Sequence, residues 1–190
     1  PHLLTELNEP MPTDAYGLSK LRAEQALAAM PDLAVTALRP VLVYGAFAKG
    51  SVGSLYQLMQ RGIPLPFDGL QAKRSYVAMD RLIDAILFAL ECPKPLQGPY
   101  IVSDPEPLTL SEFVQVLART PLDPPRLLQG EERWVPCHAR TFYVPEVLFN
   151  GLVKPIMPKL WERLMCPLVA SAQKLRQAGW QDQTRGNTNS

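Results

Sequence analysis

A tyrosine and a lysine stand four residues apart near the start of the chain, at Tyr16 and Lys20. In a helix this spacing places both side chains on one face, one turn apart. A tyrosine hydroxyl ordinarily keeps its proton up to about pH 10, and a fixed positive charge nearby lowers that pKa. A phenol tuned in this way can exchange a proton with an alcohol. The pair therefore indicates acid/base chemistry, although the bare spacing also arises by chance on exposed helices.

A helix must carry this pair. Residues 1 to 13 contain three prolines and little periodicity, which indicates a loop. Thr13 or Asp14 can cap the helix that follows, which is expected to run to about Met30 and to stop at Pro31. Leucines and alanines along it predict an apolar surface that packs beside the reactive pair.

A short apolar segment at residues 33 to 38 follows this helix. It fits a strand that is buried on both faces in a parallel sheet. Proline cannot donate a hydrogen bond to a neighbouring strand, so Pro40 is expected to mark the carboxyl end of the strand. α/β sheets bind their ligands at that edge, and helix, strand and loop meeting there are typical of nucleotide-dependent enzymes.

The composition bounds the class of protein. The 190 residues suffice for one ordinary domain, and 47% hydrophobic with 19% charged residues is a globular composition. A net charge of +1 gives no reason to expect nucleic acid as a partner. Three cysteines without C-x-x-C spacing indicate neither a disulfide framework nor a metal site. Prolines and charges interrupt the apolar region 144–170, so we expect no membrane span and a cytoplasmic location.

Several further motifs occur in a fixed order around the pair. They are Thr5-Glu6, Pro10-x-Pro12, Tyr16-Gly17-x-Ser19-Lys20-x-x-Ala23-Glu24 and Leu38-Arg39-Pro40-x-x-Val43-Tyr44-Gly45. Together they resemble the extended short-chain dehydrogenase/reductase family, specifically its NAD-dependent sugar-nucleotide epimerase/dehydratases. The resemblance continues to about residue 180 and argues against a chance origin of the pair. It implies an α/β fold, with the C-terminal portion of a Rossmann-type parallel sheet and a small α/β substrate-binding lobe.

The resemblance also implies roles for the residues of the first motifs. Tyr16 would be the general acid/base that exchanges a proton with a sugar hydroxyl while hydride passes to or from the nicotinamide of NAD or NADP. Lys20 would hold the nicotinamide ribose and keep the pKa of the tyrosine low. Pro40 would line the nicotinamide pocket through its backbone.

Substrate-binding residues are expected further along the chain. In related epimerases the segment 46–54 touches the nucleotide end of the substrate, which makes Lys49 and Ser51 candidates; a solvated glycine loop is the alternative. Arg74 begins a stretch similar to the family's Arg-x-Tyr/Phe-Val/Ile-x-Val-x-Asp signature, in which the arginine clamps the substrate pyrophosphate. A planar guanidinium suits that task because it binds phosphate oxygens in pairs. Asp80 at the end of the signature is interpreted as a helix N-cap.

The rest of the chain indicates structural elements. Residues 98–102 predict a strand, Thr109 and Glu112 predict a capping box at a helix start, and residues 171–178 predict a short helix. His138 and the arginines between residues 126 and 140 are interpreted as structural or solvated. The expected domains are the C-terminal part of a dinucleotide-binding domain at 1–45, a mixed substrate-binding lobe with returning sheet elements at 46–180 and a polar tail at 181–190.

The Gly-rich dinucleotide fingerprint does not occur in these 190 residues. In the family its glycines let the backbone approach the cofactor pyrophosphate. In the family, the serine or threonine that orients the substrate hydroxyl lies roughly two dozen residues before the tyrosine, and only 15 residues precede Tyr16 here. The chain is therefore interpreted as the C-terminal half of such an enzyme, with an unpaired sheet edge and weak or no NAD binding of its own.

The leading function is an NAD-dependent epimerase/dehydratase acting on a nucleotide sugar. Many UDP-galactose epimerases and hexose dehydratases carry asparagine where this chain has Leu42. The Arg-Pro-x-Leu-Val-Tyr-Gly form at residues 39–45 instead resembles bacterial polysaccharide-biosynthesis enzymes, which implies C4 epimerisation or reduction of a UDP-N-acetylhexosamine in surface polysaccharide synthesis. Both reactions use the same tyrosine and lysine, and the choice between them stays open. The alternative is a non-catalytic sugar-nucleotide-binding or assembly fragment. A homodimer is a further expectation for the complete protein.

Overall fold

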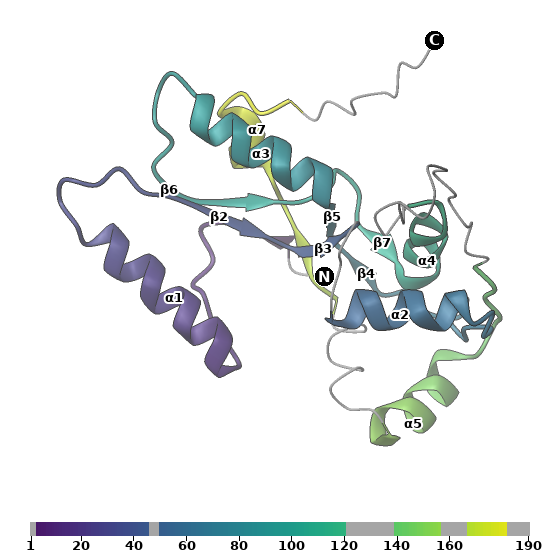
Figure 1. Ribbon diagram of the computed structural model, residues 1–190. Helices are drawn as coiled ribbons and strands as arrows, with labels where there is room; N and C mark the ends of the chain where they lie inside the picture. The colour runs from purple at the N-terminus through teal and green to yellow at the C-terminus, as the bar shows by residue number, and fades with distance from the viewer. Residues whose placement is uncertain (1–2, 46–49, 121–138, 157–166, 182–190) are drawn as a thin grey trace, which may run out of the picture.

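The computed structural model describes residues 3–45, 50–120, 139–156 and 167–181. Strands and helices alternate along much of this chain (Figure 1). In order they are β1 (Leu3–Leu4), α1 (Ala15–Ala28), β2 (Thr36–Pro40), β3 (Leu42–Tyr44), α2 (Gly50–Gln60), β4 (Lys73–Arg74), β5 (Tyr76–Ala78), α3 (Met79–Glu91), β6 (Gly98–Val102), β7 (Leu108–Thr109), α4 (Leu110–Arg119), α5 (Glu146–Ile156), β8 (Val169–Ala170) and α7 (Gln173–Gln177).

Parallel strand pairs dominate the described sheets. β2 pairs with β6 over five residues, with Thr36 opposite Gly98 and Pro40 opposite Val102. β3 pairs with β5 and β1 with β8, also in parallel, whereas β4 and β7 pair antiparallel. Parallel strands need crossover connections, which the helices between them supply. The predicted α/β class is therefore confirmed, as are the strand over 98–102 and the end of β2 at Pro40.

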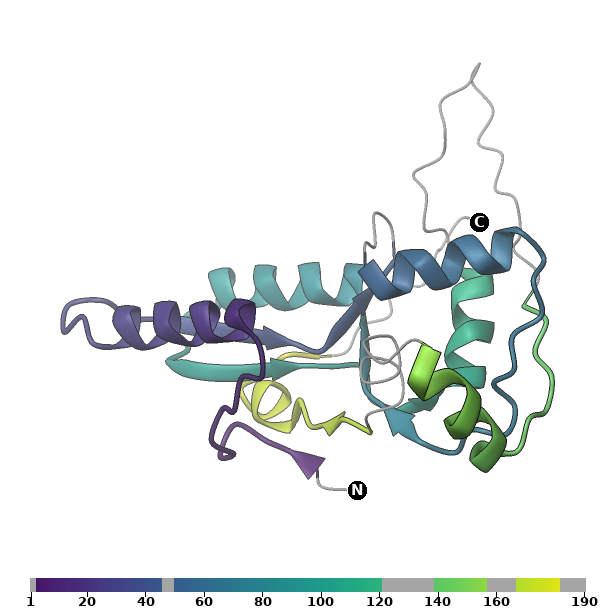
Figure 2. The same ribbon diagram turned by 90° about the horizontal axis from the view of Figure 1, so that it is seen from below.

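Helices lie on opposite sides of the β2–β6 pair. α1 lies below this pair in Figure 1 and α3 above it, and Figure 2, seen from below, shows α1 in front of α3. α1 runs antiparallel to β2, so its first turn lies on the side of the molecule where β2 ends (Figures 1 and 2). None of the described helices is long and apolar enough to span a membrane.

Two hydrophobic clusters hold the described chain together. The first joins α2, α4 and α5 to β5, and in it the Tyr76 ring stacks on Phe113 at 3.7 Å between centroids. The second joins α3, β6 and α7 around buried residues such as Val102 and Leu175. Tyr44 belongs to the first cluster, while the neighbouring Val43 packs against the second. The clusters thus meet at β3, and the expected domain boundary at residue 45 remains a prediction.

The predicted apolar packing of α1 is wrong for the described chain. α1 buries none of its residues, and Leu18 and Leu27 remain 38% and 43% exposed. β2 is likewise half-buried instead of buried on both faces. Within the described residues, β6 pairs with one edge of β2 and no named strand pairs with the other. Apolar side chains on α1 therefore remain in contact with solvent in the described chain.

The prediction that Asp80 caps a helix is also wrong. α3 begins at Met79, so Asp80 lies in the first turn and Ala78 is the N-cap residue, without a side-chain capping bond. The carboxylate of Asp104 takes over part of this task, because its Oδ1 accepts a 3.3 Å hydrogen bond from the Ala78 amide. Asp104 follows β6 and lies 26 residues after Ala78 in the sequence. The spacing around Asp80 could not reveal this partner.

Candidate active site

The first turn of α1 is held by a local cap. Asp14 is the N-cap residue, and its side chain accepts a 2.7 Å hydrogen bond from the Gly17 amide. A Cβ atom at Gly17 would lie 3.0 Å from the Asp14 carboxylate and 3.1 Å from Pro12 Cβ. Glycine therefore lets the incoming loop lie close against the helix start. This arrangement places Tyr16 in the first turn.

Tyr16 and Lys20 share one face of α1. The Lys20 Nζ lies 5.3 Å from the centroid of the Tyr16 ring, within cation–π distance. Tyr16 is 70% exposed. The Ser19 hydroxyl donates to the Tyr16 backbone carbonyl at 2.7 Å and does not engage the phenol. The spacing thus correctly predicts the shared face, and the tyrosine hydroxyl can reach a ligand that approaches α1.

One turn further along, Glu24 connects α1 to β2. Arg39 donates to its carboxylate twice, from Nε to Oε2 at 3.0 Å and from a terminal nitrogen to Oε1 at 2.6 Å. Both side chains are partly buried. Two parallel hydrogen bonds fix the relative orientation of the guanidinium and the carboxylate as well as their distance. Because Arg39 directly precedes Pro40, the contact sets α1 against the last residues of β2.

Pro40 ends β2 opposite Val102, at the carboxyl edge of the parallel pair. Ligands of open α/β sheets bind outside that edge. A phenol, an ammonium group and strand-end backbone are suitable partners for the ribose and nicotinamide of a dinucleotide, so the chemistry of Tyr16, Lys20 and Pro40 fits that end of the cofactor. Within the described residues, no group of three histidine, cysteine or acidic side chains is arranged to hold a metal.

The expected substrate-binding residues lie on other elements. Ser51 is half-buried in the first turn of α2, and Lys49 lies outside the described residues. Arg74 lies in β4, apart from α1 in both views (Figures 1 and 2). Burial raises the pKa of Tyr76 to about 12, and the positive charge of Arg74 opposes that rise. Tyr16 and Lys20 thus share one face of α1, whose first turn lies on the side where β2 ends, and the roles of all the candidate site residues remain predictions.

A polar group that the motifs did not indicate lies where β3 and β6 end. The Tyr44 hydroxyl donates to Asp104 Oδ2 at 3.0 Å, and Arg81 Nε lies 3.6 Å from Asp104 Oδ1. Burial, followed by the negative charge of Asp104, raises the pKa of Tyr44 well above its ordinary value. Tyr44 therefore stays protonated and links the strand to the start of α3. Its place in the Tyr44-Gly45 motif was visible in the sequence, but its partner was not.

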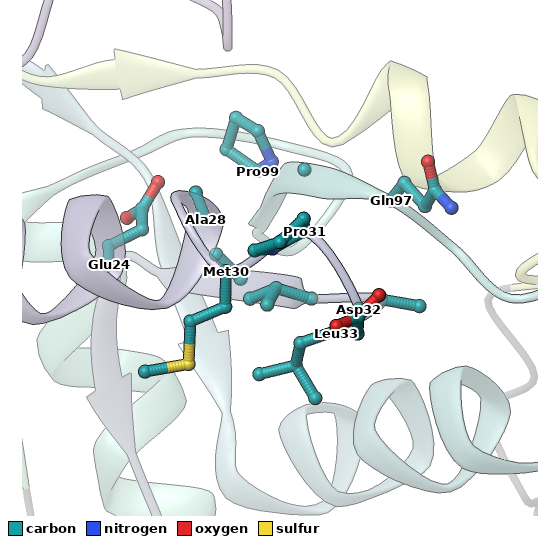
Figure 3. A pocket seen from close by; sticks show the side chains of 12 residues that line it. Glu24, Ala28, Met30, Pro31, Asp32, Leu33, Gln97 and Pro99 are labelled. Carbon is teal, nitrogen blue, oxygen red and sulfur yellow. The ribbon is translucent and has the colours of Figure 1, made fainter.

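A hollow of about 530 Å³ opens at the opposite end of the β2–β6 pair. Figure 3 shows its lining, with Glu24 at one side and Pro99 and Gln97 across from it. Val35 and Gly98 also line it, which places it where β2 and β6 begin. It is therefore distinct from the strand-end region beside Tyr16.

The fold and this arrangement define a class of protein. The model of the NAD dependent epimerase/dehydratase family matches residues 2–102, more than half of the chain, and the chain belongs to that family. The match covers α1 and the paired strands β2 and β6, with Tyr16, Lys20 and Pro40.

Individual relatives agree with this family. A UDP-glucose 4-epimerase of Vibrio cholerae is 40% identical over 111 residues, which are 56% of this chain and 34% of that protein. The solved UDP-glucuronic acid 4-epimerase of Bacillus cereus in complex with NAD has a TM-score of 0.61 at 18% identity, covering 93% of this chain and 47% of that one. MoeE5 in complex with UDP-glucose and NAD gives 0.57 at 20% identity, covering 92% and 52%. The chain thus spans about a third of the curated relative and half of these structures, whose likeness supports the fold.

Proposed function

We propose that this chain carries the acid/base residues of an NAD-dependent epimerase/dehydratase that acts on a nucleotide sugar. The observation that carries the proposal is the placement of Tyr16 and Lys20 on one face of α1, with the first turn on the side where β2 ends at Pro40. Family membership and the V. cholerae relative support the same reaction class.

In this mechanism the Tyr16 hydroxyl exchanges a proton with a hydroxyl of the sugar. Lys20 would hold the ribose of the cofactor beside it, because an ammonium group donates hydrogen bonds to ribose hydroxyls. The backbone at Pro40 closes the site from the strand side. NAD or NADP, when bound, supplies hydride transfer to and from the sugar carbon. Exposure of Tyr16 is consistent with a hydroxyl that must meet a ligand.

The substrate we propose is a UDP-N-acetylhexosamine that reacts at C4, in a cytoplasmic step of surface polysaccharide synthesis. Arg74 would bind its pyrophosphate, with Lys49 and Ser51 toward the nucleotide. The Arg-Pro-x-Leu-Val-Tyr-Gly form at residues 39–45 supports this choice, because it resembles bacterial polysaccharide-biosynthesis enzymes that act on such substrates. Weak NAD binding by the 190 residues alone and homodimerisation of the complete protein remain predictions.

The test is Tyr16→Phe in the complete reading frame that encodes this chain, assayed with UDP-N-acetylglucosamine and UDP-glucose. Phenylalanine keeps the ring and lacks the hydroxyl that exchanges the proton, so turnover should fall at least 100-fold while nucleotide-sugar binding persists. Tyr143→Phe is the matched control, because Tyr143 is also 70% exposed and shortly precedes α5, a helix that lies apart from α1 in Figures 1 and 2. Retained activity in Tyr16→Phe would exclude it as the acid/base. Binding without turnover in the unmodified protein would favour a non-catalytic sugar-nucleotide-binding role.

A further inference from the structure

We propose that the Glu24–Arg39 pair positions Tyr16 and Lys20 at the carboxyl end of β2. The two hydrogen bonds of this pair, at 3.0 and 2.6 Å, join the middle of α1 to the penultimate residue of β2. The catalytic consequence rests on the proposed function, whereas the positioning itself can be tested separately.

The geometry of α1 connects the pair to the reactive residues. Tyr16, Lys20 and Glu24 follow one another at intervals of four, so they lie along neighbouring positions of one helix face. From Glu24 the axis rises about 6 Å to Lys20 and about 12 Å to Tyr16. Since α1 runs antiparallel to β2, this direction is also the one in which β2 proceeds from Arg39 to Pro40 (Figures 1 and 2). The pair therefore aligns the reactive face with the strand end.

The packing of α1 explains why an ion pair would carry this task. No residue of α1 is buried in the described chain, so apolar contacts constrain its sliding and rotation weakly. A bidentate pair between partly buried side chains is directional, so it resists both sliding and rotation of α1. A slip of one helical turn would move Tyr16 by about 5 Å. Misplacement by about 1 Å can already cost about 100-fold in rate.

The chain provides matched variants. Glu24→Ala removes the carboxylate and keeps a strong helix former. Gln25→Ala makes the same kind of change at the adjacent exposed position of α1 and is the control. Arg39→Lys keeps the charge and loses the paired donors. The double variant Glu24→Arg with Arg39→Glu restores an ion pair with its polarity reversed.

Hydrogen exchange of the α1 amides in the 190-residue chain tests the positioning. Glu24→Ala should speed exchange in the last two turns of α1 about fivefold, Arg39→Lys less, and the reversed pair should return it toward the original rate. Gln25→Ala and the amides of β6 should stay unchanged. Unchanged α1 exchange in Glu24→Ala, or failure of the reversed pair to recover it, would overturn the proposal whether or not the protein is an enzyme.

Kinetics of the complete protein test the consequence for Tyr16 and Lys20. Glu24→Ala should lower kcat at least tenfold with KM for the nucleotide sugar changed less than twofold, and the reversed pair should recover most of kcat. An equal loss of kcat in Gln25→Ala would show a general effect of changing α1 and contradict a positioning role. Absence of turnover in the unmodified protein counts against the proposed function and leaves the exchange experiment to decide the positioning.

Discussion

The hydroxyl of Tyr44 donates a 3.0 Å hydrogen bond to the carboxylate of Asp104, although the two residues are 60 positions apart. The same carboxylate accepts from the Ala78 amide and lies 3.6 Å from Arg81. One acidic side chain therefore joins the end of β3, the loop after β6 and the start of α3. These elements lie beside the strand ends where the proposed site is located.

Replacing Tyr44 by phenylalanine should lower the free energy of unfolding by about 1 kcal/mol, the usual net value of a hydrogen bond. The ring keeps its packing against Phe113, so the change isolates the hydroxyl. Urea denaturation followed by circular dichroism measures the difference, with Tyr143→Phe as the exposed control. Equal stability of Tyr44→Phe and the unmodified chain would show that the bond to Asp104 contributes nothing net.

The capping box of α4 should contribute measurably to stability. Thr109 accepts from the Glu112 amide at 3.3 Å, and the Glu112 carboxylate accepts from the Thr109 amide at 2.7 Å. Thr109→Ala should cost about 1 kcal/mol in the same urea titration. Thr13→Ala, an exposed threonine that caps no helix, should change stability little. A loss as large at Thr13 would contradict the capping explanation.

Stability should also depend on the charge of Glu112. Hydrogen bonds from the backbone and side chain of Thr109 lower the pKa of Glu112 below its ordinary value of 4.5. The ionised group therefore stabilises the fold above the ordinary pKa, and this contribution disappears as the pH falls through the lower folded value. The stability difference between the unmodified chain and Glu112→Gln should shrink as the pH is lowered from 6 toward 3. The contribution of Glu112 to stability should be small because its carboxylate is exposed. A stability difference that grows toward low pH would contradict the predicted direction of the pH dependence.

Gly45 should be intolerant of a side chain. It adopts φ of 127°, and a Cβ atom there would lie 3.0 Å from Met79 Cβ at the start of α3. Gly45→Ala should lower stability by about 1–3 kcal/mol through backbone strain and this contact. Gly151→Ala is the contrast, because nothing lies within 4 Å of its added Cβ in α5, and it should be neutral or stabilising by up to about 1 kcal/mol. Thermal unfolding of both variants makes the comparison.

Local patterns in the sequence predicted much of this structure. The capping signal at Asp14, the stop of β2 at Pro40 and the capping box at Thr109 each depend on neighbouring residues, and the structure confirms all three. The four-residue interval likewise placed Tyr16 and Lys20 on one helix face. Such features were predictable because backbone geometry relates residues a few positions apart in a fixed way.

Only the tertiary structure decided which distant residues meet. Arg39 and Glu24 were both visible as motif residues, yet their pairing depends on α1 lying alongside β2 in the folded chain. Asp104, and not Asp80, supports the start of α3, because the Asp104 carboxylate from the loop after β6 accepts the hydrogen bond of the Ala78 amide. The exposure of α1 was also not predictable, since an amphipathic pattern indicates which side chains can be buried but not whether a surface is present to cover them. The sequence thus determined the residue types and local geometry of the candidate site, and chain packing determined their alignment.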